Sequence, residues 1–244
     1  ILYGVTYGAG KFVAVGNSGV TFYSSDGKTW SSGTGASGDL KGVTYGAGKF
    51  VGVGNIGVTF YSTDGKTWTQ GDSAEGVDLT GVTYGAGKFV AVGNTGATFY
   101  STDGKTWTPG TGVSGILNGV TYGAGKFVAV NQSGDTFYSI DGKTWSPSTG
   151  ASGILQGVTY GAGKFVAVNQ SGDTFYSTDG KTWTQGTGAS GNLRGVTYGA
   201  GKFVAVGNTV DYYSLDGKIW SPGTGAGGNL WAVTCKRYNP EYIE

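Results

Sequence analysis

Residues 4–12 read Gly4-Val5-Thr6-Tyr7-Gly8-Ala9-Gly10-Lys11-Phe12, and the same nine residues begin again at Gly42, Gly81, Gly119, Gly157 and Gly195. The spacings are 38, 39, 38, 38 and 38 residues, and a degenerate seventh copy begins at Leu230. Self-similarity at a period of this length is the sequence signature of solenoids and propellers. The chain therefore consists of six whole units and one additional copy of the beginning of a unit.

Each unit is predicted to form four short strands. In the first unit they cover residues 2–7, 11–15, 20–24 and 29–31, separated by turns at 8–10, 17–19 and 26–27 that all contain glycine. The run Phe12-Val13-Ala14-Val15 is apolar without alternation, which is typical of a strand buried on both faces. Neighbouring sheets must cover both sides, so the predicted fold is an all-β, six-bladed propeller. A linear β-solenoid is disfavoured because its coils are usually shorter and need distinct caps.

The seventh copy of the first strand, residues 230–235, poses a problem of space. A six-bladed ring has six places for a first strand, and the sequence holds seven copies. We expect one copy to lie outside the ring, to pair with another chain, or to belong to a longer array of which this chain is a fragment. The predicted division is a propeller over residues 1–235 and a C-terminal tail over 236–244.

Composition excludes several classes of function. The 51 glycines, 16 tyrosines and 7 tryptophans suit a turn-rich β protein, and a net charge of +1 leaves no electrostatic attraction to nucleic acid or anionic membrane. No apolar run is long enough to span a bilayer. With no histidine and one cysteine, the sequence lacks the usual ligands of zinc, copper and haem, so no metal or other cofactor is expected.

A second motif, Ser24-Ser25-Asp26-Gly27-Lys28-Thr29-Trp30, recurs with small changes in all six units. It resembles the Asp-box, or BNR repeat, of the sialidase-type propeller families, with one residue fewer between Asp and Trp. The resemblance covers about nine-tenths of the chain. Structural roles are predicted for the aspartate, as acceptor of turn N–H groups, and for the tryptophan, as filler between blades. The residues are Asp26, Trp30, Asp64, Trp68, Asp103, Trp107, Asp141, Trp145, Asp179, Trp183, Asp216 and Trp220.

Catalysis is not expected. Sialidases that share the motif use three arginines and a Tyr–Glu pair, whereas this chain has only Arg194 and Arg237. Its three glutamates, Glu75, Glu241 and Glu244, lie in a loop and in the tail rather than at repeated positions. Without histidine only carboxylates or lysines could act as bases, and the lysines recur at turns, where a solvated charge is the simpler interpretation.

One candidate ligand site is the mouth of the channel. The residue after the leucine of each first strand varies more than any other position among the copies, and in a propeller it lies near the channel. Long polar and aromatic side chains around one hollow suit a sugar or another small polar ligand. A solvent-exposed position at which the residue type is not constrained would explain the same variation. The candidate residues are Tyr3, Lys41, Thr80, Asn118, Gln156, Arg194 and Trp231.

The second candidate site is the set of turns that follow the second strands. Copies four and five replace Gly-Asn with Asn-Gln and add an aspartate, a joint change that fits either a hydrogen-bonding pocket between blades or a swapped turn. The new residues also form N-glycosylation sequons, a weak signal. The candidate residues are Asn17, Asn55, Asn94, Asn131, Gln132, Asp135, Asn169, Gln170, Asp173, Asn208 and Asp211.

The leading hypothesis is a secreted or cell-surface lectin, since several equivalent weak sites on one rigid disc give avidity for glycans. The rival hypothesis is a structural, display or adhesion module of a bacterial surface, filament or phage-like assembly, with residues 235–244 docking a neighbour or a second copy. A designed or reconstructed symmetric propeller without a ligand is a third reading, because the copies are so alike.

Overall fold

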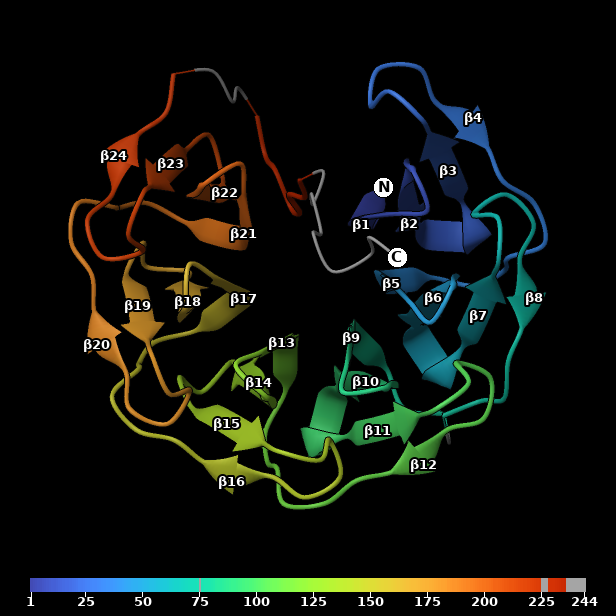
Figure 1. Cartoon of the computed structure of the whole chain (residues 1–244), viewed down its shortest axis with the longest axis horizontal. Helices are drawn as coiled ribbons and strands as arrows, with labels where there is room; N and C mark the ends of the chain where they lie inside the picture. Colours follow the sequence, from blue (N-terminus) through green and yellow to red (C-terminus); the bar gives the residue numbers. More distant parts are fainter. Residues whose placement is uncertain (75, 225–227, 236–244) are drawn as a thin grey trace, which may run out of the picture.

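Six four-stranded antiparallel sheets form the blades of a propeller in the computed structural model, which describes residues 1–74, 76–224 and 228–235 (Figure 1). Each sheet is a meander in sequence order. The first blade comprises β1 (Leu2–Gly8), β2 (Lys11–Gly16), β3 (Thr21–Ser24) and β4 (Ser31–Ser32). The predicted all-β six-bladed propeller is therefore confirmed.

The other blades repeat this plan with nearly constant strand lengths. The second and third are β5 (Leu40–Gly46), β6 (Lys49–Gly54), β7 (Thr59–Ser62), β8 (Thr69–Gln70) and β9 (Leu79–Gly85), β10 (Lys88–Gly93), β11 (Thr98–Ser101), β12 (Thr108–Pro109). The fourth and fifth are β13 (Leu117–Gly123), β14 (Lys126–Asn131), β15 (Thr136–Ser139), β16 (Ser146–Pro147) and β17 (Leu155–Gly161), β18 (Lys164–Asn169), β19 (Thr174–Ser177), β20 (Thr184–Gln185). The sixth is β21 (Leu193–Gly199), β22 (Lys202–Gly207), β23 (Asp211–Ser214) and β24 (Ser221–Pro222).

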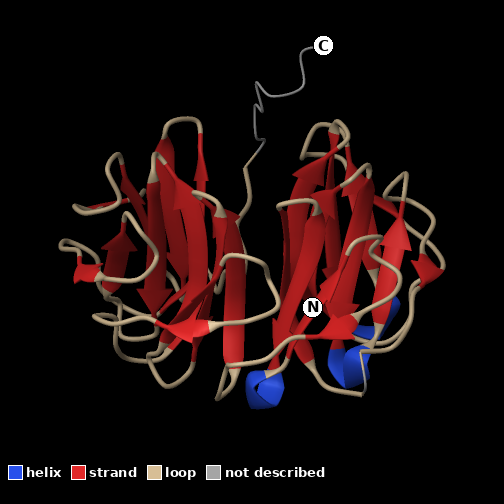
Figure 2. Ribbon diagram, turned by 60° about the horizontal axis from the view of Figure 1, so that its bottom comes forward, coloured by secondary structure: helices blue, strands red, loops and turns tan. Residues whose placement is uncertain are grey.

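Helical structure is limited, in the described residues, to three single turns of 3₁₀ helix: η1 (Asn17–Gly19), η2 (Asn55–Gly57) and η3 (Asn94–Gly96). They lie together on one face of the disc (Figure 2). None of the helical segments is of a length or hydrophobicity that would cross a bilayer.

The first turn of each blade joins β1 to β2 and its equivalents. Ala9 and Gly10 both have positive φ, 46° and 76°, as a type I′ turn requires, and the same pair recurs in every blade. The second strand is buried along its apolar run in the second to fifth blades; Val51, Val90 and Val128, for example, have no exposed surface. The prediction that this strand is covered on both faces is confirmed for these four blades, whereas Phe12 in the first blade and Val204 in the sixth are only partly buried.

The fourth strand differs from the prediction. It was expected at residues 29–31, but β4 covers only Ser31–Ser32 and begins after Trp30. The cause is the carboxylate of Asp26, which accepts the N–H groups of Lys28 and Thr29 at 2.8 Å each. These residues are held in the turn and are not available to pair as a strand.

Five apolar cores lie between successive blades. In the first, Val13 and Val15 of β2 pack against Leu40, Phe50, Phe60 and Trp68 of the second blade, and the other four cores repeat this arrangement. Each blade thus presents valines to the next blade and an aromatic face to the preceding one. The predicted filling of the space between blades by tryptophan is confirmed for Trp68, Trp145, Trp183 and Trp220, which are 3–4% exposed, and Trp107 packs there while partly buried. The prediction is wrong for Trp30, which is 38% exposed because no blade among the described residues packs on that side of it.

The seventh copy of the first strand does not leave the ring, contrary to the premise that only six places exist. Residues 229–235 run inward beside the sixth blade, at the opening between β21–β24 and β1–β4 (Figure 1). A Cβ on Gly195 would meet Trp231 and Ala232, and one on Gly4 would meet Lys41 and Gly42 in the same way. The segment therefore occupies a seventh first-strand place.

Candidate functional site

The Ser-x-Asp turn is a closed hydrogen-bonded unit. Asp141 Oδ1 accepts the N–H groups of Lys143 (2.8 Å) and Thr144 (3.0 Å) and the hydroxyl of Ser139 (3.1 Å), while Gly142 N–H donates to that hydroxyl oxygen. All six copies repeat this pattern, including the Ile219 variant. The prediction that the aspartate accepts turn N–H groups is confirmed.

These contacts lower the pKa of the aspartates. For Asp26 the N–H groups of Thr29 and Lys28 and the hydroxyl of Ser24 lower the pKa from 3.8 to about 2. The pKa of the other five is also lowered, and the causes again include the turn N–H donors and serine. Such groups are ionised at neutral pH and already engaged, which suits a structural role.

The central channel has a volume of about 230 Å³ and is lined by all seven first-strand copies. Threonine comes from every copy, valine from all but the second, and tyrosine from the first four; Cys235 stands where the seventh tyrosine would be. The Sγ of Cys235 donates to the carbonyl oxygen of Tyr198 at 2.8 Å. This lining escaped the sequence analysis because it hardly varies among the copies and therefore gave no signal there. Strand alternation combined with invariance could have indicated it.

The predicted channel-mouth residues occupy β-bulges. In every blade the register shifts between the leucine that opens the first strand and the glycine two residues later, so the variable residue is the unpaired one. Thr80 Oγ1 donates to the carbonyl oxygen of Leu117 at 2.6 Å, and Asn118 Nδ2 to that of Leu155 at 2.6 Å. These two side chains link neighbouring blades.

Two cations of this set lie on aromatic rings. Lys41 Nζ is 3.7 Å from the ring centroid of Tyr3 and 3.7 Å from a carboxylate oxygen of Asp39. The Arg194 guanidinium is 3.9 Å from the ring centroid of Trp231, and Arg194 Nε donates to Asn208 Oδ1 at 2.7 Å. The Arg194–Asn208 hydrogen bond fixes the guanidinium beneath the indole ring.

A shallow hollow of about 180 Å³ lies at this end of the channel. Asn118, Gln156 and Trp231 line it, together with glycines and valines of the first strands. Trp231 is 48% exposed. The structure thus brings together three of the seven predicted residues in this hollow, whereas Tyr3 lines a separate cleft with Trp30 and residues 229–232.

The turns of the fourth and fifth blades are closed by their own side chains. Asn131 is fully buried; its Oδ1 accepts the N–H groups of Ser133 (2.9 Å) and Asp135 (2.8 Å), and its Nδ2 donates to Asp135 Oδ2 (3.0 Å) and Ser114 O (3.4 Å). Asn169 and Asp173 repeat this arrangement. Gln132 and Gln170 are exposed beside them. The amide groups of both asparagines are fully used, by their own turn and by the carbonyl oxygen of Ser114 or Ser152 in the preceding loop.

The turns of the first three blades rely on two aspartates that the sequence analysis missed. Asp39 accepts the N–H of Ser18 at 2.9 Å and faces Asn55 Nδ2 at 3.5 Å. Asp78 accepts the N–H of Ile56 at 2.7 Å and the Nδ2 of Asn94 at 3.3 Å. Isoleucine stands at this position before the fourth and fifth blades, where the turn carries its own aspartate. This correlation between the residue before the blade and the aspartate of the turn could have revealed the role of Asp39 and Asp78 from the sequence.

The remaining predicted turn residues also have local partners. Asn17 Oδ1 accepts a hydrogen bond from the N-terminal amine at 2.6 Å. Asn208 forms an isolated antiparallel β-bridge with Asn229, and its side chain accepts a hydrogen bond from Arg194. Asp211 opens β23 opposite Val206. Among the described residues no three His, Cys, Asp or Glu side chains are grouped so as to hold a metal ion.

Comparison with known proteins identifies the fold. No protein-family model and no curated protein sequence matches the chain. Among solved structures, Ycf48 bound to a D1 peptide is 16% identical with a TM-score of 0.69, covering 91% of this chain and 80% of that one, and Ycf48 from Cyanidioschyzon merolae is 16% identical at 0.70, covering 95% and 88%. The WD40 β-propeller domain of Doa1 is 13% identical with a TM-score of 0.78, covering 96% and 86%. These similarities establish a β-propeller and leave its activity open.

Proposed function

We propose that this protein is a non-catalytic, lectin-like propeller that binds a carbohydrate at the mouth of its channel, and that it acts in a secreted or cell-surface setting. The observation that carries the proposal is the exposed indole of Trp231 above the hollow that Asn118 and Gln156 also line. An aromatic face suits the C–H face of a sugar ring, and amides suit its hydroxyl groups.

The geometry around Trp231 supports this choice. Its ring is backed by the Arg194 guanidinium, which Asn208 holds in place, so the indole is ordered before a ligand arrives. The side chain of Gln156 has no hydrogen-bond partner within the described residues, which leaves its amide for a ligand. A volume of about 180 Å³ suits one sugar ring or another small polar group rather than a drug-sized molecule.

The proposal has one carbohydrate site on each chain instead of the several equivalent sites that the sequence led us to expect. The amides of Asn131 and Asn169 are engaged in their own turns, so we place one site on each chain, at the channel mouth, rather than one in each turn. We also propose that the chain is a distant, shortened Asp-box propeller. The six closed Ser-x-Asp turns support that assignment, as does their resemblance to the BNR repeat.

The test is a glycan-array screen of the purified chain, followed by calorimetry on any hit. We expect a stoichiometry of one and a loss of affinity of at least about tenfold in Trp231→Ala and Gln156→Ala. Gln132→Ala, in an exposed turn residue on the same face, is the matched control and should leave binding unchanged. Several sites per chain would favour the turns instead. A folded protein that binds no glycan would overturn the proposal.

A structural, display or adhesion module is the second candidate. It is favoured by a different observation, the exposed apolar face of the first blade, on which Leu2 is 44% and Trp30 is 38% exposed. Exposed aromatic and aliphatic side chains that lie together are typical of protein-binding surfaces. Residues 236–244, predicted to dock a neighbour, lie outside the described residues.

A further inference from the structure

We propose that the opening between the sixth and first blades is a docking site for the second, third and fourth strands of one more repeat of this type, presented by another polypeptide segment. The inference is independent of carbohydrate binding. It rests on three observations: a seventh first-strand place already filled, an uncovered blade face on each side of the opening, and polar groups there that lack the partners they have elsewhere.

The inner strand of the missing blade is in place. A Cβ on Gly161 would clash with the ring of Tyr198, and one on Gly199 would clash in the same way with the side chain of Cys235, the equivalent residue of the next copy. The loop before the segment is also equivalent, since Thr209 N–H donates to Gly228 O (3.0 Å) as Gly96 N–H donates to Gly115 O. Residues 229–235 thus have the position of a first strand, and among the described residues the three strands that accompany it in every other blade are missing.

The first blade exposes the face that all other blades bury. Leu2 is 44% and Trp30 is 38% exposed, whereas Leu40 and Trp68, their counterparts in the second blade, are 0% and 3% exposed. Phe12 and Phe22 are also partly exposed, although their counterparts Phe50 and Phe60 are buried. A cleft of about 310 Å³ between this face and residues 229–232 is lined by Leu2, Tyr3, Val5, Ala14 and Trp30.

The sixth blade exposes the complementary face. Val204 is partly exposed, whereas its counterparts Val13, Val51, Val90, Val128 and Val166 have no exposed surface. The five cores between blades are made by this valine face against the Leu/Phe/Trp face of the next blade. The two halves of a sixth such core are present at the opening, but they do not reach each other.

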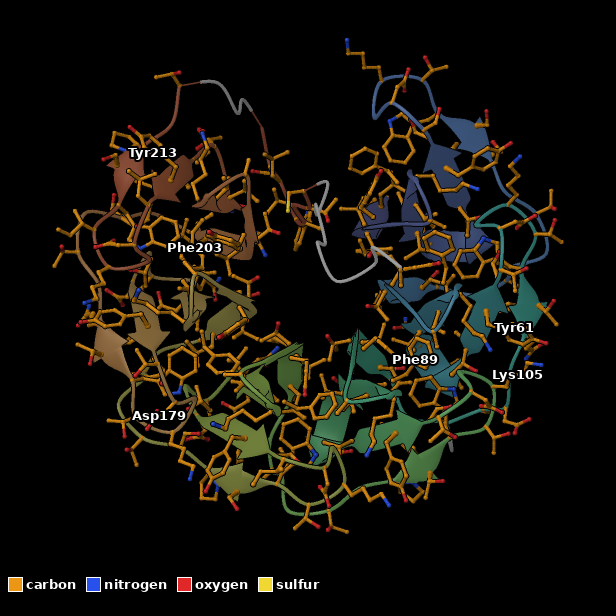
Figure 3. All side chains as sticks on the ribbon, viewed as in Figure 1. Tyr61, Phe89, Lys105, Asp179, Phe203 and Tyr213 are labelled. Atoms are coloured by element: carbon orange, nitrogen blue, oxygen red, sulfur yellow. The ribbon has the colours of Figure 1, made fainter. Side chains whose placement is uncertain are left out.

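Polar contacts between blades are also incomplete there. In the inner part of the interface, Lys11 Nζ donates to Asp64 O (2.9 Å), Lys49 to Asp103 O (2.8 Å) and Lys88 to Asp141 O (2.8 Å). At the outer rim a lysine of each following blade lies over a tyrosine of the blade before it. Lys105 and Tyr61 are one such pair (Figure 3), and Lys105 Nζ is 4.8 Å from the centroid of the tyrosine ring. At the opening Tyr213 is 43% exposed, and within the described part of the chain the cation over its ring is Lys202 of its own blade, whose Nζ is 6.0 Å from the ring centroid.

The number of missing strands indicates what kind of segment would fill the opening. The described residues supply six complete four-stranded blades and one inner strand, so a ring of seven places lacks three strands among them. A second copy lacks the same three and could fill the opening only by unmaking a blade of its own. The faces on both sides are those that bury this repeat at five other interfaces, so a segment equivalent to β18–β20 (residues 164–185) has the matching chemistry on both sides.

The first test inserts residues 161–185 after Cys235 of the full chain, so that the inserted Gly161 continues from the seventh inner strand in the register of the fifth blade. We expect the melting temperature to rise by about 5 °C or more and the Trp30 indole to become protected from oxidative labelling. A matched insertion in which Val166 and Val168 are replaced by aspartate should give neither effect. An insertion that stays protease-sensitive, with Trp30 still labelled, would overturn the proposal.

The second test adds a labelled peptide of residues 164–185 to the unmodified protein and follows the fluorescence anisotropy of the peptide. We expect saturable one-to-one binding that Leu2→Asp weakens by at least about tenfold. Ile140→Asp, at an exposed isoleucine of the fourth blade, is the control and should have no effect. Concentration-dependent dimerisation that is abolished by Leu2→Asp, without peptide binding, would show that a second copy covers the face and would contradict the proposal.

Discussion

Trp30 and Trp145 hold the same position in their repeats, yet Trp145 is 4% exposed and Trp30 is 38% exposed. The exposure differs because the neighbouring blades differ. Trp145 packs on Val90 and Val92 of the preceding blade, whereas no blade among the described residues packs on Trp30 in this way. Trp145→Ala should therefore destabilise the protein by about 3–5 kcal/mol, as a large-to-small core substitution does. Trp30→Ala should cost less than half of that. Urea denaturation of both variants checks the contrast, and equal losses would mean that Trp30 is covered in solution.

Ile56 is a β-branched residue in the left-handed region, with φ of 56°, and it is 71% exposed. Backbone of this kind costs a β-branched residue about 1–2 kcal/mol, while asparagine tolerates it. Ile56→Asn should raise the free energy of unfolding by about 1 kcal/mol. Ile140, also 71% exposed but without positive φ, provides the control: Ile140→Asn should change stability little. A lower denaturation midpoint in Ile56→Asn would show that the Ile56 side chain makes a stabilising contact.

Acid should destabilise the fold through the Ser-x-Asp turns. The pKa of these six aspartates is lowered in the folded chain, to about 2 for Asp26, so the unfolded chain takes up protons first as the pH falls. Their contribution is complete above about pH 5 and is lost progressively from about pH 4 towards pH 2. Denaturation midpoints between pH 7 and pH 2 test this. Asp141→Asn should lower stability at pH 7 and flatten the acid limb, and an unchanged pH profile would contradict the assignment.

Asn131 is fully buried and makes four hydrogen bonds, three within its turn and one to the carbonyl oxygen of Ser114. Asn131→Ala leaves the N–H groups of Ser133 and Asp135 without their acceptor, which should cost about 2 kcal/mol. Gln132→Ala, next to it but exposed, should cost almost nothing. Calorimetric melting of the two variants separates a structural turn from a ligand site. A neutral Asn131→Ala that abolished glycan binding would restore the turns as the site.

Much of the blade could be predicted from the sequence because its signals are local. The Ala-Gly turns, the apolar run from Phe12 and the Asp26 turn each specify their own backbone, and six repetitions removed the ambiguity. The fourth strand was placed too early because β-propensity at Thr29 and Trp30 competes with the Asp26 carboxylate, which holds the N–H groups of Lys28 and Thr29 in the turn. That competition depends on hydrogen-bond geometry that a residue pattern does not express.

The site was harder to predict because it depends on contacts between repeats. The variable position after each leucine was found, but whether it faces a ligand or a neighbour depends on the next blade, as for Thr80 and Asn118. Asp39 and Asp78 were missed because each serves turns of two different blades. The number of places around the channel depends on the angle at which the apolar faces pack, and the sequence of one repeat does not report that angle.

The opening beside Trp30 also bears on how this protein comes apart. In a fully closed ring every blade is held from both sides, and unfolding must break two interfaces before any blade is released. Here the first and sixth blades each have one complete interface, so the molecule behaves as a linear array whose stability is a sum over neighbours. Fraying begins at the two ends and moves inward, and amide hydrogens of the third and fourth blades, farthest from the opening, exchange last.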